Sequence, residues 1–257
     1  MQPVSLSLIR YIQSLQQKKF RLQHRAFVVE GEKMLNELLA TGYSIQYLCA
    51  LSSWYENHQE IAGRVHACYQ VNTRELGRIS SLRQPNQVLA VVHMPEESSS
   101  VPAPESGLQL ALESIQDPGN LGTIIRTADW FGLQQIFCSK DTAELYNPKV
   151  IQATMGSFAR VKVIYTDLPK LVKETQKHMR VYAAMLAGTP LPRLKINRNA
   201  MLLIGNESRG LSAELHKLAD ICYAIPGKGG AESLNASVAS GISLAWFHAE
   251  QSSSPDV

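Results

Sequence analysis

Two kinds of hydrophobic pattern alternate in the first hundred residues of the chain. Short runs rich in β-branched and aromatic residues are typical of strands, and stretches whose apolar residues recur every three or four positions are typical of amphipathic helices. The strand-like runs are FVVEG, IQYLCAL, VHACYQV and VLAVVHM, and the helix-like stretches include EKMLNELLATG and TRELGRIS. We therefore expect a small α/β domain over residues 1–96.

The same alternation continues after residue 107. Strand-like runs occur at LQLALES, QQIFCS, ARVKVIYT, RVYAAML, MLLIGNES and CYAIP. Helices are predicted to start at Asn120, Asn147 and Leu168, and a last long helix to run from about Asn235 to His248. Strands separated by single helices predict a mainly parallel sheet, which binds ligands beyond the carboxyl ends of its strands. We expect this second α/β domain to span residues 108–251, with a tail at 252–257.

A segment with neither pattern separates the two domains. The stretch PEESSSVPAPESG concentrates Pro, Ser, Glu and Gly between two apolar runs, a composition typical of linkers. It predicts a linker over residues 97–107. The chain length of 257 residues agrees with two domains, because a single domain usually has roughly 100–150 residues.

Charge and cysteine content narrow the class of protein. The net charge is only +3, but residues 1–35 hold six basic and two acidic residues, a local charge of +4 that fits either a polyanionic partner or a solvated helix. Four cysteines lie far apart without a C-x-x-C spacing, which indicates buried free thiols and no metal site. No apolar run reaches about 18 residues and no signal-peptide pattern occurs, so we expect a cytoplasmic protein without a membrane segment.

Three strand ends in the second domain lead into loops of unusual composition. The first loop begins the stretch DPGNLGTIIRTADWFG, in which Pro-Gly predicts a turn and Asn120 predicts the N-cap of the next helix. On that helix Asn120, Thr123 and Thr127 lie near one another, and Arg126 projects about one and a half turns from its start. Most arginines lie at the surface without a special role, so this stretch alone assigns none to Arg126.

The second and third loops are GNESRGL, residues 205–211, and AIPGKGGAESLN, residues 224–235. Polar residues crowd the second loop after a buried strand, as they also do in ordinary helix-capping loops. Three glycines within four positions of the third loop let the backbone approach a ligand closely. The small and apolar residues after Asn235 predict a helix that is buried nearly all round and packs tightly against another helix, within or between chains.

Several other kinds of site do not fit these loops. GKGGAES lacks the spacing of a phosphate-binding P-loop, and no G-x-G-x-x-G follows a first strand. No G-x-S-x-G elbow accompanies the seven scattered histidines, which argues against a Ser/His/Asp hydrolase. An enzyme of nucleotide metabolism with a different glycine-rich phosphate loop stays open as an alternative, and it would bind a nucleoside triphosphate.

Taken in order, the three stretches resemble the three motifs of the SpoU (TrmH-like) branch of the SPOUT RNA methyltransferases. DPGNLGTIIRTADWFG is similar to the first motif with its asparagine and arginine, GNESRGL to the second, and IPGKGGAESLNASVASGI to the third. KKFRLQHRAFVVEGEKMLNELL and QVLAVV resemble, more loosely, the small RNA-binding domain that precedes the catalytic domain in members acting on ribosomal RNA. The stretch RQPNQ lacks the glycine that usually stands before the final strand of that domain.

The resemblance implies a SPOUT fold with a trefoil knot in its C-terminal part and a homodimer formed through this domain. It implies S-adenosylmethionine as cofactor and methylation of a ribose 2′-hydroxyl of RNA, with ribosomal RNA as the expected substrate and transfer RNA as the alternative. A non-catalytic RNA-binding protein on the same fold is a further alternative. The intact motif residues argue against it, because binding alone does not need them all.

The resemblance also assigns roles to residues of this chain. The catalytic residues would be Arg126, Asn120, Glu207, Ser233 and Asn235. We favour a role for Arg126 in positioning the ribose and its 3′ phosphate, because arginine stays protonated in proteins; whether it also takes the hydroxyl proton is left open. The cofactor would be held by Gly205, Ile225 and Leu234, with Ala184, Met185 and Gly230 as neighbours. Salt-dependent phosphate contacts with RNA are expected from Lys18, Lys19, Arg21 and Arg25.

Overall fold

The computed structural model describes residues 2–65, 67–96, 104 and 106–253. The chain divides into two compact units, one formed by residues 1–97 and 146–159, the other by residues 98–145 and 160–257. The predicted linker at 97–107 lies largely outside the described residues. No helix within the described ranges is both long enough and apolar enough to cross a membrane.

The first unit is an α/β domain, as predicted. Its strands are β1 (Gln2–Pro3), β2 (Ala26–Glu30), β3 (Ile45–Ala50), β4 (Cys68–Gln70) and β5 (Val88–His93). Its helices before the linker are α1 (Leu6–Ser14), α2 (Lys18–His24), α3 (Glu32–Thr41), α4 (Ser52–Asn57), α5 (Gln59–Ala62) and α6 (Thr73–Ile79). The strands lie in the order β1-β4-β3-β5-β2, and β5 runs antiparallel to β3 and β2.

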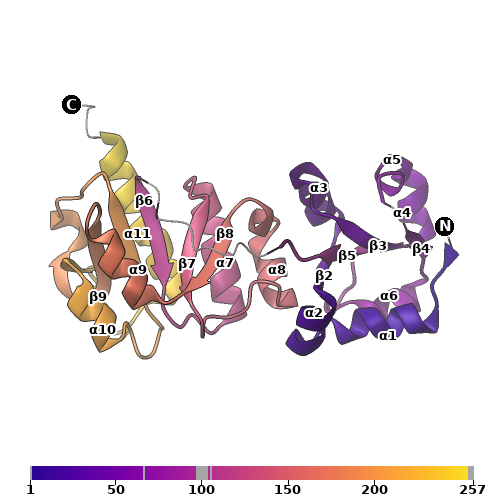
Figure 1. Ribbon diagram of the computed structural model, residues 1–257, viewed down its shortest axis with the longest axis horizontal. Helices are drawn as coiled ribbons and strands as arrows, with labels where there is room; N and C mark the ends of the chain where they lie inside the picture. Colours follow the sequence, from indigo (N-terminus) through magenta and orange to yellow (C-terminus); the bar gives the residue numbers. More distant parts are fainter. Residues whose placement is uncertain (1, 66, 97–103, 105, 254–257) are drawn as a thin grey trace. The chain divides into compact units, whose positions relative to one another are not determined.

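Helices cover both faces of this sheet. Figure 1 shows α1, α2 and α6 on one face and α3, α4 and α5 on the other. Ile12 of α1 and Leu76 of α6 pack with Val28 of β2 and Val91 of β5 in one buried cluster. These apolar positions recur every third or fourth residue on the helices and every second residue on the strands, and this periodicity is why the sequence predicted α6, β2 and β5.

Residues 146–159 lie within the predicted second domain but contact the first unit. The sequence placed them in the second domain, but their contacts group them with the first unit. Tyr146 precedes α8 (Pro148–Thr154), and Phe158 lies in η1 (Ser157–Ala159). Their ring centroids are 4.5 and 5.8 Å from that of Phe27 on β2. Aromatic side chains at such distances pack favourably. Sequence periodicity cannot predict this grouping, because it does not show which segment covers the second face of β2.

The second unit contains the remaining elements. Its strands are β6 (Leu108–Leu112), β7 (Gln135–Ser139), β8 (Lys162–Thr166), β9 (Arg180–Pro190), β10 (Ala200–Ile204) and β11 (Ile221–Ala224). Its helices are α7 (Pro118–Trp130), α9 (Leu168–Thr175), η2 (Leu191–Arg193), α10 (Ala213–Leu218) and α11 (Ala236–Ser253).

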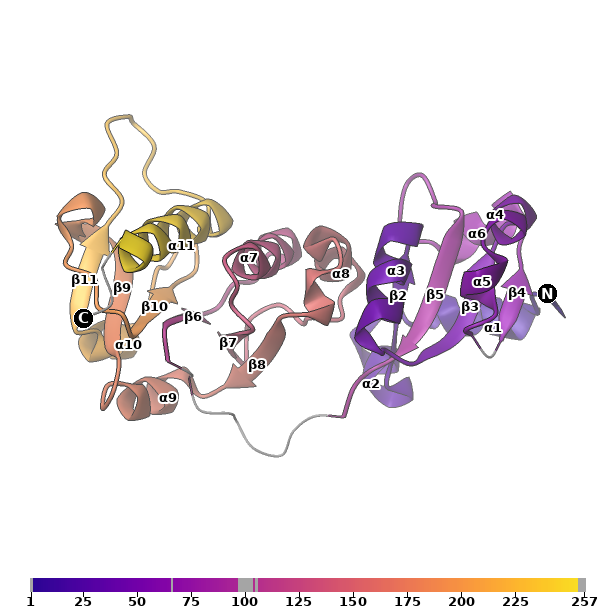
Figure 2. The ribbon, with the colours of Figure 1, turned by 90° about the horizontal axis from the view of Figure 1, so that it is seen from above.

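The strands of the second unit form the parallel sheet that the sequence predicted. Their order is β11-β9-β10-β6-β7-β8, and each neighbouring pair runs parallel. Figure 2 shows α7 and α11 on one face and α9 and α10 on the other. The last residues of β6 and β10, Leu112 and Ile204, are register partners. The loops that follow these two strands are therefore neighbours at one edge of the sheet.

Two helix boundaries differ from the prediction. Helix α7 begins at Pro118, and its N-cap is Asp117, whose Oδ1 accepts a hydrogen bond from the Asn120 backbone N–H at 2.8 Å. The predicted N-cap at Asn120 is therefore wrong, because proline fits the first helical position and the cap is the residue before it. Helix α11 continues to Ser253, beyond both the predicted end at His248 and the predicted end of the domain at residue 251.

The burial of α11 was overestimated. Leu244 and Phe247 are fully buried, but Val238 and Ile242 are 48% and 37% exposed. The predicted close helix packing occurs within the chain, since a Cβ atom on Gly241 would lie 3.9 Å from the Thr127 side chain of α7. The helix thus has one buried face and one exposed apolar face.

The four cysteines are free thiols, as predicted, but they are not equally buried. Cys49 and Cys138 are buried, whereas Cys68 and Cys222 are half-buried. Burial raises the pKa of the Cys49 thiol to about 12, so this thiol stays protonated at neutral pH.

Arg21 corrects another expectation, because it is not available to RNA. Its side chain is buried, and its Nη1 donates hydrogen bonds to the carbonyl oxygens of Leu15 and Gln16, both at 2.9 Å. These carbonyls follow α1, where backbone acceptors lack partners within the helix. The guanidinium therefore stabilises the end of α1. No sequence pattern distinguishes Arg21 from Lys18 and Lys19 beside it, which are exposed.

Replacing Arg21 should destabilise the first unit. We expect Arg21→Met to lower its free energy of unfolding by roughly 2–3 kcal/mol, because two backbone acceptors lose a charged donor. Lys18→Met is the matched control and should cost less than about 0.5 kcal/mol, because Lys18 is exposed. Hydrogen exchange of the backbone amides of β2 and β5 reports the stability of the first unit separately from that of the second. Equal protection in both variants would contradict the assignment.

Candidate active site

Three side chains from the three predicted motifs meet at the carboxyl edge of the parallel sheet. Asn120 lies in the first turn of α7, Glu207 follows β10, and Asn235 precedes α11. The Asn120 Nδ2 donates to Glu207 Oε1, and the Asn235 Nδ2 donates to Asn120 Oδ1 at 2.8 Å. We call these three residues the Asn120 cluster. They form one hydrogen-bonded chain although Asn120 and Asn235 are 115 residues apart in sequence.

The orientation of Asn235 follows from its position before α11. Its Oδ1 accepts hydrogen bonds from the Ser237 backbone N–H at 2.9 Å and from the Ser237 hydroxyl at 2.6 Å. Asparagine is a favoured residue for satisfying the free N–H groups of a helix N-terminus. Since the carbonyl oxygen is used in this way, the amide NH₂ is directed to Asn120. The predicted start of the last helix at Asn235 is thus confirmed to within one residue.

The turn that carries Glu207 is closed by unusually tight backbone packing. Asn206 and Gly210 exchange two backbone hydrogen bonds, of 3.2 and 2.8 Å, and the Asn206 Nδ2 donates to the Ser114 carbonyl at 2.9 Å. A Cβ atom on Gly205 would lie 2.3 Å from the carbonyl carbon of Gly210. Only glycine fits at position 205 without opening the turn.

A supporting network that the motifs did not reveal lies beside this turn. Asp141 accepts hydrogen bonds from the hydroxyls of Ser114 at 2.5 Å and Ser139 at 2.6 Å. These two bonds lower the pKa of the Asp141 carboxyl. Ser114 has a φ of 57°, in the left-handed region, and its carbonyl receives the Asn206 amide. The only sequence signal was that polar residues follow two strands, β6 and β7, which are neighbours in the sheet.

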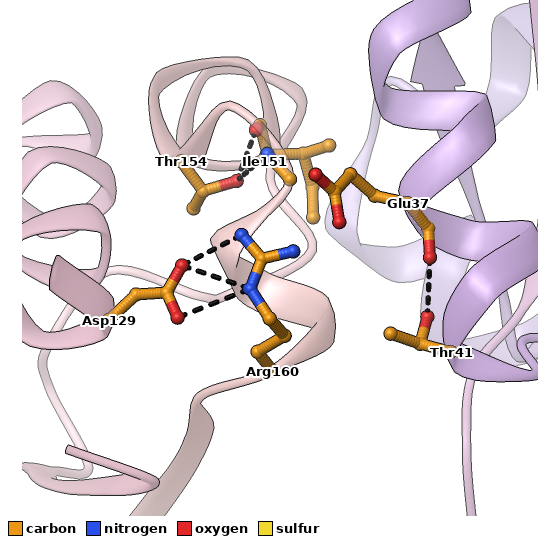
Figure 3. Close-up of polar contacts among 7 residues, drawn as sticks. Glu37, Thr41, Asp129, Ile151, Thr154 and Arg160 are labelled. Atoms are coloured by element: carbon orange, nitrogen blue, oxygen red, sulfur yellow. Dashed lines mark hydrogen bonds and ion pairs between the residues drawn. The ribbon is translucent and has the colours of Figure 1, made fainter. Parts of the chain in front are cut away.

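Hydrogen bonds anchor both ends of helix α7, whereas the side chain of Arg126, near the middle of the helix, has none to the described part of the chain. Asp117 caps the N-terminus, and Asp129 near the C-terminus binds Arg160 through its Nε and Nη2, the shortest contact being 2.7 Å (Figure 3). Arg126 is exposed and has no side-chain hydrogen bond or ion pair with any described residue. Ser233 is exposed too. A single chain therefore assembles Asn120, Glu207 and Asn235 without Arg126 or Ser233.

The positions expected to hold the cofactor lie at three neighbouring strand ends. The order β11-β9-β10 brings Ala184 and Met185, Gly205 and Ile225 to the same edge of the sheet. The register of β11 with β9 jumps from Ala183 to Thr189, so residues 184–188 are left out of that ladder.

This edge fits the chemistry of S-adenosylmethionine. Backbone N–H and C=O groups outside a ladder can pair with the adenine edge, and the half-buried Met185 and the 43% exposed Leu234 offer apolar contact. Gly230 lies in an open part of the third loop, where an added Cβ atom would meet no other atom within 4 Å. The strand order thus brings four of the six expected positions to this edge, while Leu234 directly precedes Asn235 and Gly230 lies in the open loop.

The basic residues of the first unit are distributed unevenly over its two faces. Helices α1, α2 and α6 hold six basic residues and one acidic residue, whereas α3, α4 and α5 hold one basic and four acidic residues. Lys18 and Lys19 belong to the basic face and are exposed, and Arg25 directly after α2 is exposed while its Nη2 donates to the Pro95 carbonyl at 2.6 Å. The positive charge of the first unit is therefore concentrated on the face that holds Lys18 and Lys19, for which we predicted contacts with RNA.

The parallel α/β sheet, the polar cluster at its carboxyl edge and the small basic α/β unit before it agree with the SPOUT methyltransferase class that the three motifs resemble. The comparison with known families agrees. The SpoU rRNA methylase family matches residues 107–245, and the MRM3-like substrate binding domain matches residues 7–90. The chain therefore belongs to the SpoU rRNA methylase family, as its three motifs indicated.

Named enzymes and solved structures are similar to this chain over different shares of its length. The Bacillus subtilis 23S rRNA guanosine 2′-O-methyltransferase RlmP is 31% identical over 233 residues, which are 89% of this chain and 90% of the relative. An AdoMet-bound rRNA methyltransferase from Sinorhizobium meliloti superposes with a TM-score of 0.85 at 29% identity and covers 97% of both chains. An A. aeolicus TrmH/SpoU tRNA modifying enzyme has a TM-score of 0.51 at 25% identity and covers 58% of this chain and 77% of its own.

Adding one methyl group at Gly205 should disrupt the site. We expect Gly205→Ala to destabilise the second unit by roughly 1–3 kcal/mol, because the new Cβ meets backbone atoms that cannot rotate away. Gly227→Ala is the matched control, since a Cβ at position 227 meets nothing within 4 Å. Urea unfolding of both variants measures the difference. Similar midpoints and slopes for the two variants would show that the turn is not tightly closed.

Proposed function

We propose that this protein transfers the methyl group of S-adenosylmethionine to a ribose 2′-hydroxyl of large-subunit ribosomal RNA. The observation that carries the proposal is the Asn120 cluster, in which one residue from each motif joins a single hydrogen-bonded chain. A structural role alone would not require the cluster to lie at the exposed carboxyl edge of the sheet, where parallel sheets bind ligands.

The choice of ribosomal RNA is supported by the extent of the similarities. RlmP and the S. meliloti rRNA methyltransferase match both units of this chain, whereas the tRNA modifying enzyme covers 58% of it. The first unit is thus shared with enzymes named for ribosomal RNA. Transfer RNA is the alternative substrate. We propose the cytoplasm as the place of the reaction, in line with the expectation from the sequence.

We assign one group of residues to binding the cofactor and another to aligning the ribose. When bound, the cofactor supplies an electrophilic methyl group on a sulfonium. Gly205, Ile225 and Leu234 would hold it, with Ala184, Met185 and Gly230 beside them. Asn120 and Asn235, held by Glu207, would orient the ribose at the edge of the sheet. Alignment of this kind can lower a barrier by roughly 7–11 kcal/mol in favourable cases.

Arg126 and Ser233 would engage only when RNA is bound. Both are exposed, so they can close on the ribose and its 3′ phosphate without breaking contacts within the chain. Arginine suits this role because its planar guanidinium pairs with two phosphate oxygens at once. We assign to Arg126 the positioning of the phosphate and the stabilisation of the negative charge that develops on the ribose oxygen as the hydroxyl loses its proton.

Arg126→Ala should abolish methyl transfer and leave the cofactor bound. We expect at least a hundredfold loss of rate, typical of removing a group that stabilises transition-state charge. The assay follows labelled methyl transfer from S-adenosylmethionine to separated ribosomal and transfer RNA pools. Lys170→Ala, an exposed cation on α9, is the control and should keep full activity. An Arg126→Ala enzyme with normal activity would remove this residue from the mechanism.

We also propose a homodimer that covers the exposed apolar face of α7 and α11, and a trefoil knot in the C-terminal part of the fold. Trp130 of α7 is 84% exposed, and Val238 and Ile242 of α11 are exposed as well. An apolar face of this kind is typical of a protein–protein interface. Arg126 lies one helical turn before Trp130, so it would border the partner chain in such a dimer.

A charge at the centre of this face should dissociate the dimer. We expect Ile242→Glu to shift the protein to monomers, because a carboxylate would be buried without a partner. Leu6→Glu is the control, since Leu6 is 63% exposed and belongs to α1 of the first unit. Sedimentation velocity gives the oligomeric state of both variants. A dimer that persists in Ile242→Glu would place the interface elsewhere.

We propose that the α1, α2 and α6 face of the first unit binds RNA phosphates. Lys18 and Lys19 are exposed on this face, and the opposite face is net acidic. Phosphate contacts release counterions, so each contributes about 0.7–0.9 to the slope of log affinity against log salt concentration.

Removing two cations from this face should lower the affinity for RNA and make that affinity less dependent on salt concentration. We expect the double variant Lys18→Gln/Lys19→Gln to reduce the slope by roughly 1.5. Lys33→Gln/Arg64→Gln is the matched control, because these exposed cations lie on and beside the acidic face. Filter binding at several salt concentrations measures both. Equal slopes for the two double variants would contradict the assignment of the face.

A further inference from the structure

A basic segment of the second unit lies outside the site described above. Residues 191–199, LPRLKINRN, connect β9 to β10 and contain Arg193, Lys195 and Arg198 but no acidic residue. All three cations are exposed. The methyl-transfer mechanism uses none of them. We call residues 191–199 the β9–β10 segment.

Hydrogen bonds from Tyr182 on β9 and Gln251 on α11 hold the β9–β10 segment in place. The single proton of the Tyr182 hydroxyl is shared between the Lys195 carbonyl at 3.1 Å and Asn197 Oδ1 at 2.9 Å, and the hydroxyl oxygen accepts from the Asn197 backbone N–H at 3.0 Å. Tyr182 is fully buried and packs edge-on against Phe247, with ring centroids 4.9 Å apart. From α11, the Gln251 Nε2 donates to the carbonyls of Asn197 and Arg198 at 3.0 and 2.8 Å.

Such anchoring matters for the binding of a charged partner. A segment already fixed in one conformation loses little conformational entropy when a ligand binds. Its backbone is fixed by a buried hydroxyl and a glutamine, and not by the charged side chains. Arg193 and Lys195 have no side-chain partner among the described residues. Their charges are therefore not neutralised by this part of the protein.

The segment borders a shallow depression with a positive lining. The depression has a volume of about 480 Å³, and its charged lining residues are Lys177, Arg180 and Arg198, with no acidic residue among the lining. Asp220 pairs with Arg180 at 3.7 Å. Lys177, Arg193 and Lys195 are three further exposed cations, so the surface stays net positive after this pairing.

A second depression of the same unit shows that this charge is not a general property of its surface. That depression has a volume of about 460 Å³ and is lined by Lys170 and Lys173 together with Asp167, Glu174 and Glu214. Lys173 pairs with Glu214 at 3.3 Å. The two hollows are alike in size and differ in charge, and only the one beside the β9–β10 segment suits a polyanion.

The basic depression is remote from the reacting residues. Asn235 caps the N-terminus of α11, whereas Gln251 binds the β9–β10 segment near its C-terminus. These positions are sixteen residues apart, and a helix rises 1.5 Å per residue, which gives a separation of about 24 Å. The distance exceeds the Debye length of about 8 Å at physiological ionic strength, so the two regions do not influence each other through their charges.

We propose that the β9–β10 segment and Lys177 form a second RNA-binding surface, which holds backbone phosphates of the substrate away from the methylated nucleotide. The inference rests on the proposed function, because it takes the same RNA as its ligand. A positive, preorganised surface with no apolar anchor suits phosphates rather than bases or a protein partner. The surface contributes to affinity and not to the chemical step.

A double variant with a matched control tests this inference in the full-length protein. Arg193→Gln/Lys195→Gln removes two free cations and leaves Tyr182 and Gln251 in place. Lys170→Gln/Lys173→Gln removes two cations from the other hollow. We expect the first double variant to raise the KM for RNA several-fold, to keep kcat at saturating RNA and to reduce the salt slope of RNA binding by roughly 1.5. The control should match the wild type in all three quantities.

The outcomes separate this inference from the proposed function. Unchanged KM and salt slope in Arg193→Gln/Lys195→Gln, with methyl transfer intact, would overturn the second surface and leave the proposed function standing. A fall in kcat at constant KM would also overturn it, because the effect would then lie in the chemical step. Failure of the wild-type protein to methylate any RNA would instead contradict the proposed function. Cofactor affinity, equal in all variants, serves as the check on folding.

Discussion

The site depends on the amide of Asn120, which must donate and accept at the same time. Its NH₂ group binds Glu207 and its carbonyl oxygen binds Asn235. Only asparagine among residues of this length has both a donor and an acceptor group in a fixed orientation. Because Asn120 lies in the first turn of α7, Glu207 after β10 and Asn235 before α11, this one side chain holds three segments together.

The parallel sheet makes this link possible. Strands β6 and β10 are neighbours and end in register, so the loops that carry Asn120 and Glu207 start side by side. Strand β9 lies between β10 and β11, and its departure from the β11 ladder at residues 184–188 leaves backbone groups at the same edge. The polar network of Ser114, Ser139 and Asp141 and the tight approach of Gly205 to Gly210 then fix the loops themselves.

Much of this arrangement could be predicted from the sequence, because it rests on local patterns. Strand and helix positions follow from periodicity, and the parallel sheet follows from their alternation. Three features could not be predicted in this way. The N-cap of α7 is Asp117 and not the predicted Asn120, because Pro118 occupies the first helical position. The burial of Arg21 depends on the carbonyls that follow α1. The grouping of residues 146–159 with the first unit depends on Phe27, whose partners are distant in sequence.

Alkaline hydrolysis of labelled RNA tests most directly whether the acceptor atom is a ribose oxygen, as the proposed function requires. Alkali cleaves RNA by attack of the 2′-hydroxyl on the adjacent phosphate, so a methyl group on that oxygen blocks cleavage at its nucleotide. After methyl transfer from labelled S-adenosylmethionine to ribosomal RNA and complete alkaline digestion, we predict that the label is recovered in dinucleotides. Recovery of the label in mononucleotides would show methylation of a base and would contradict transfer to the ribose.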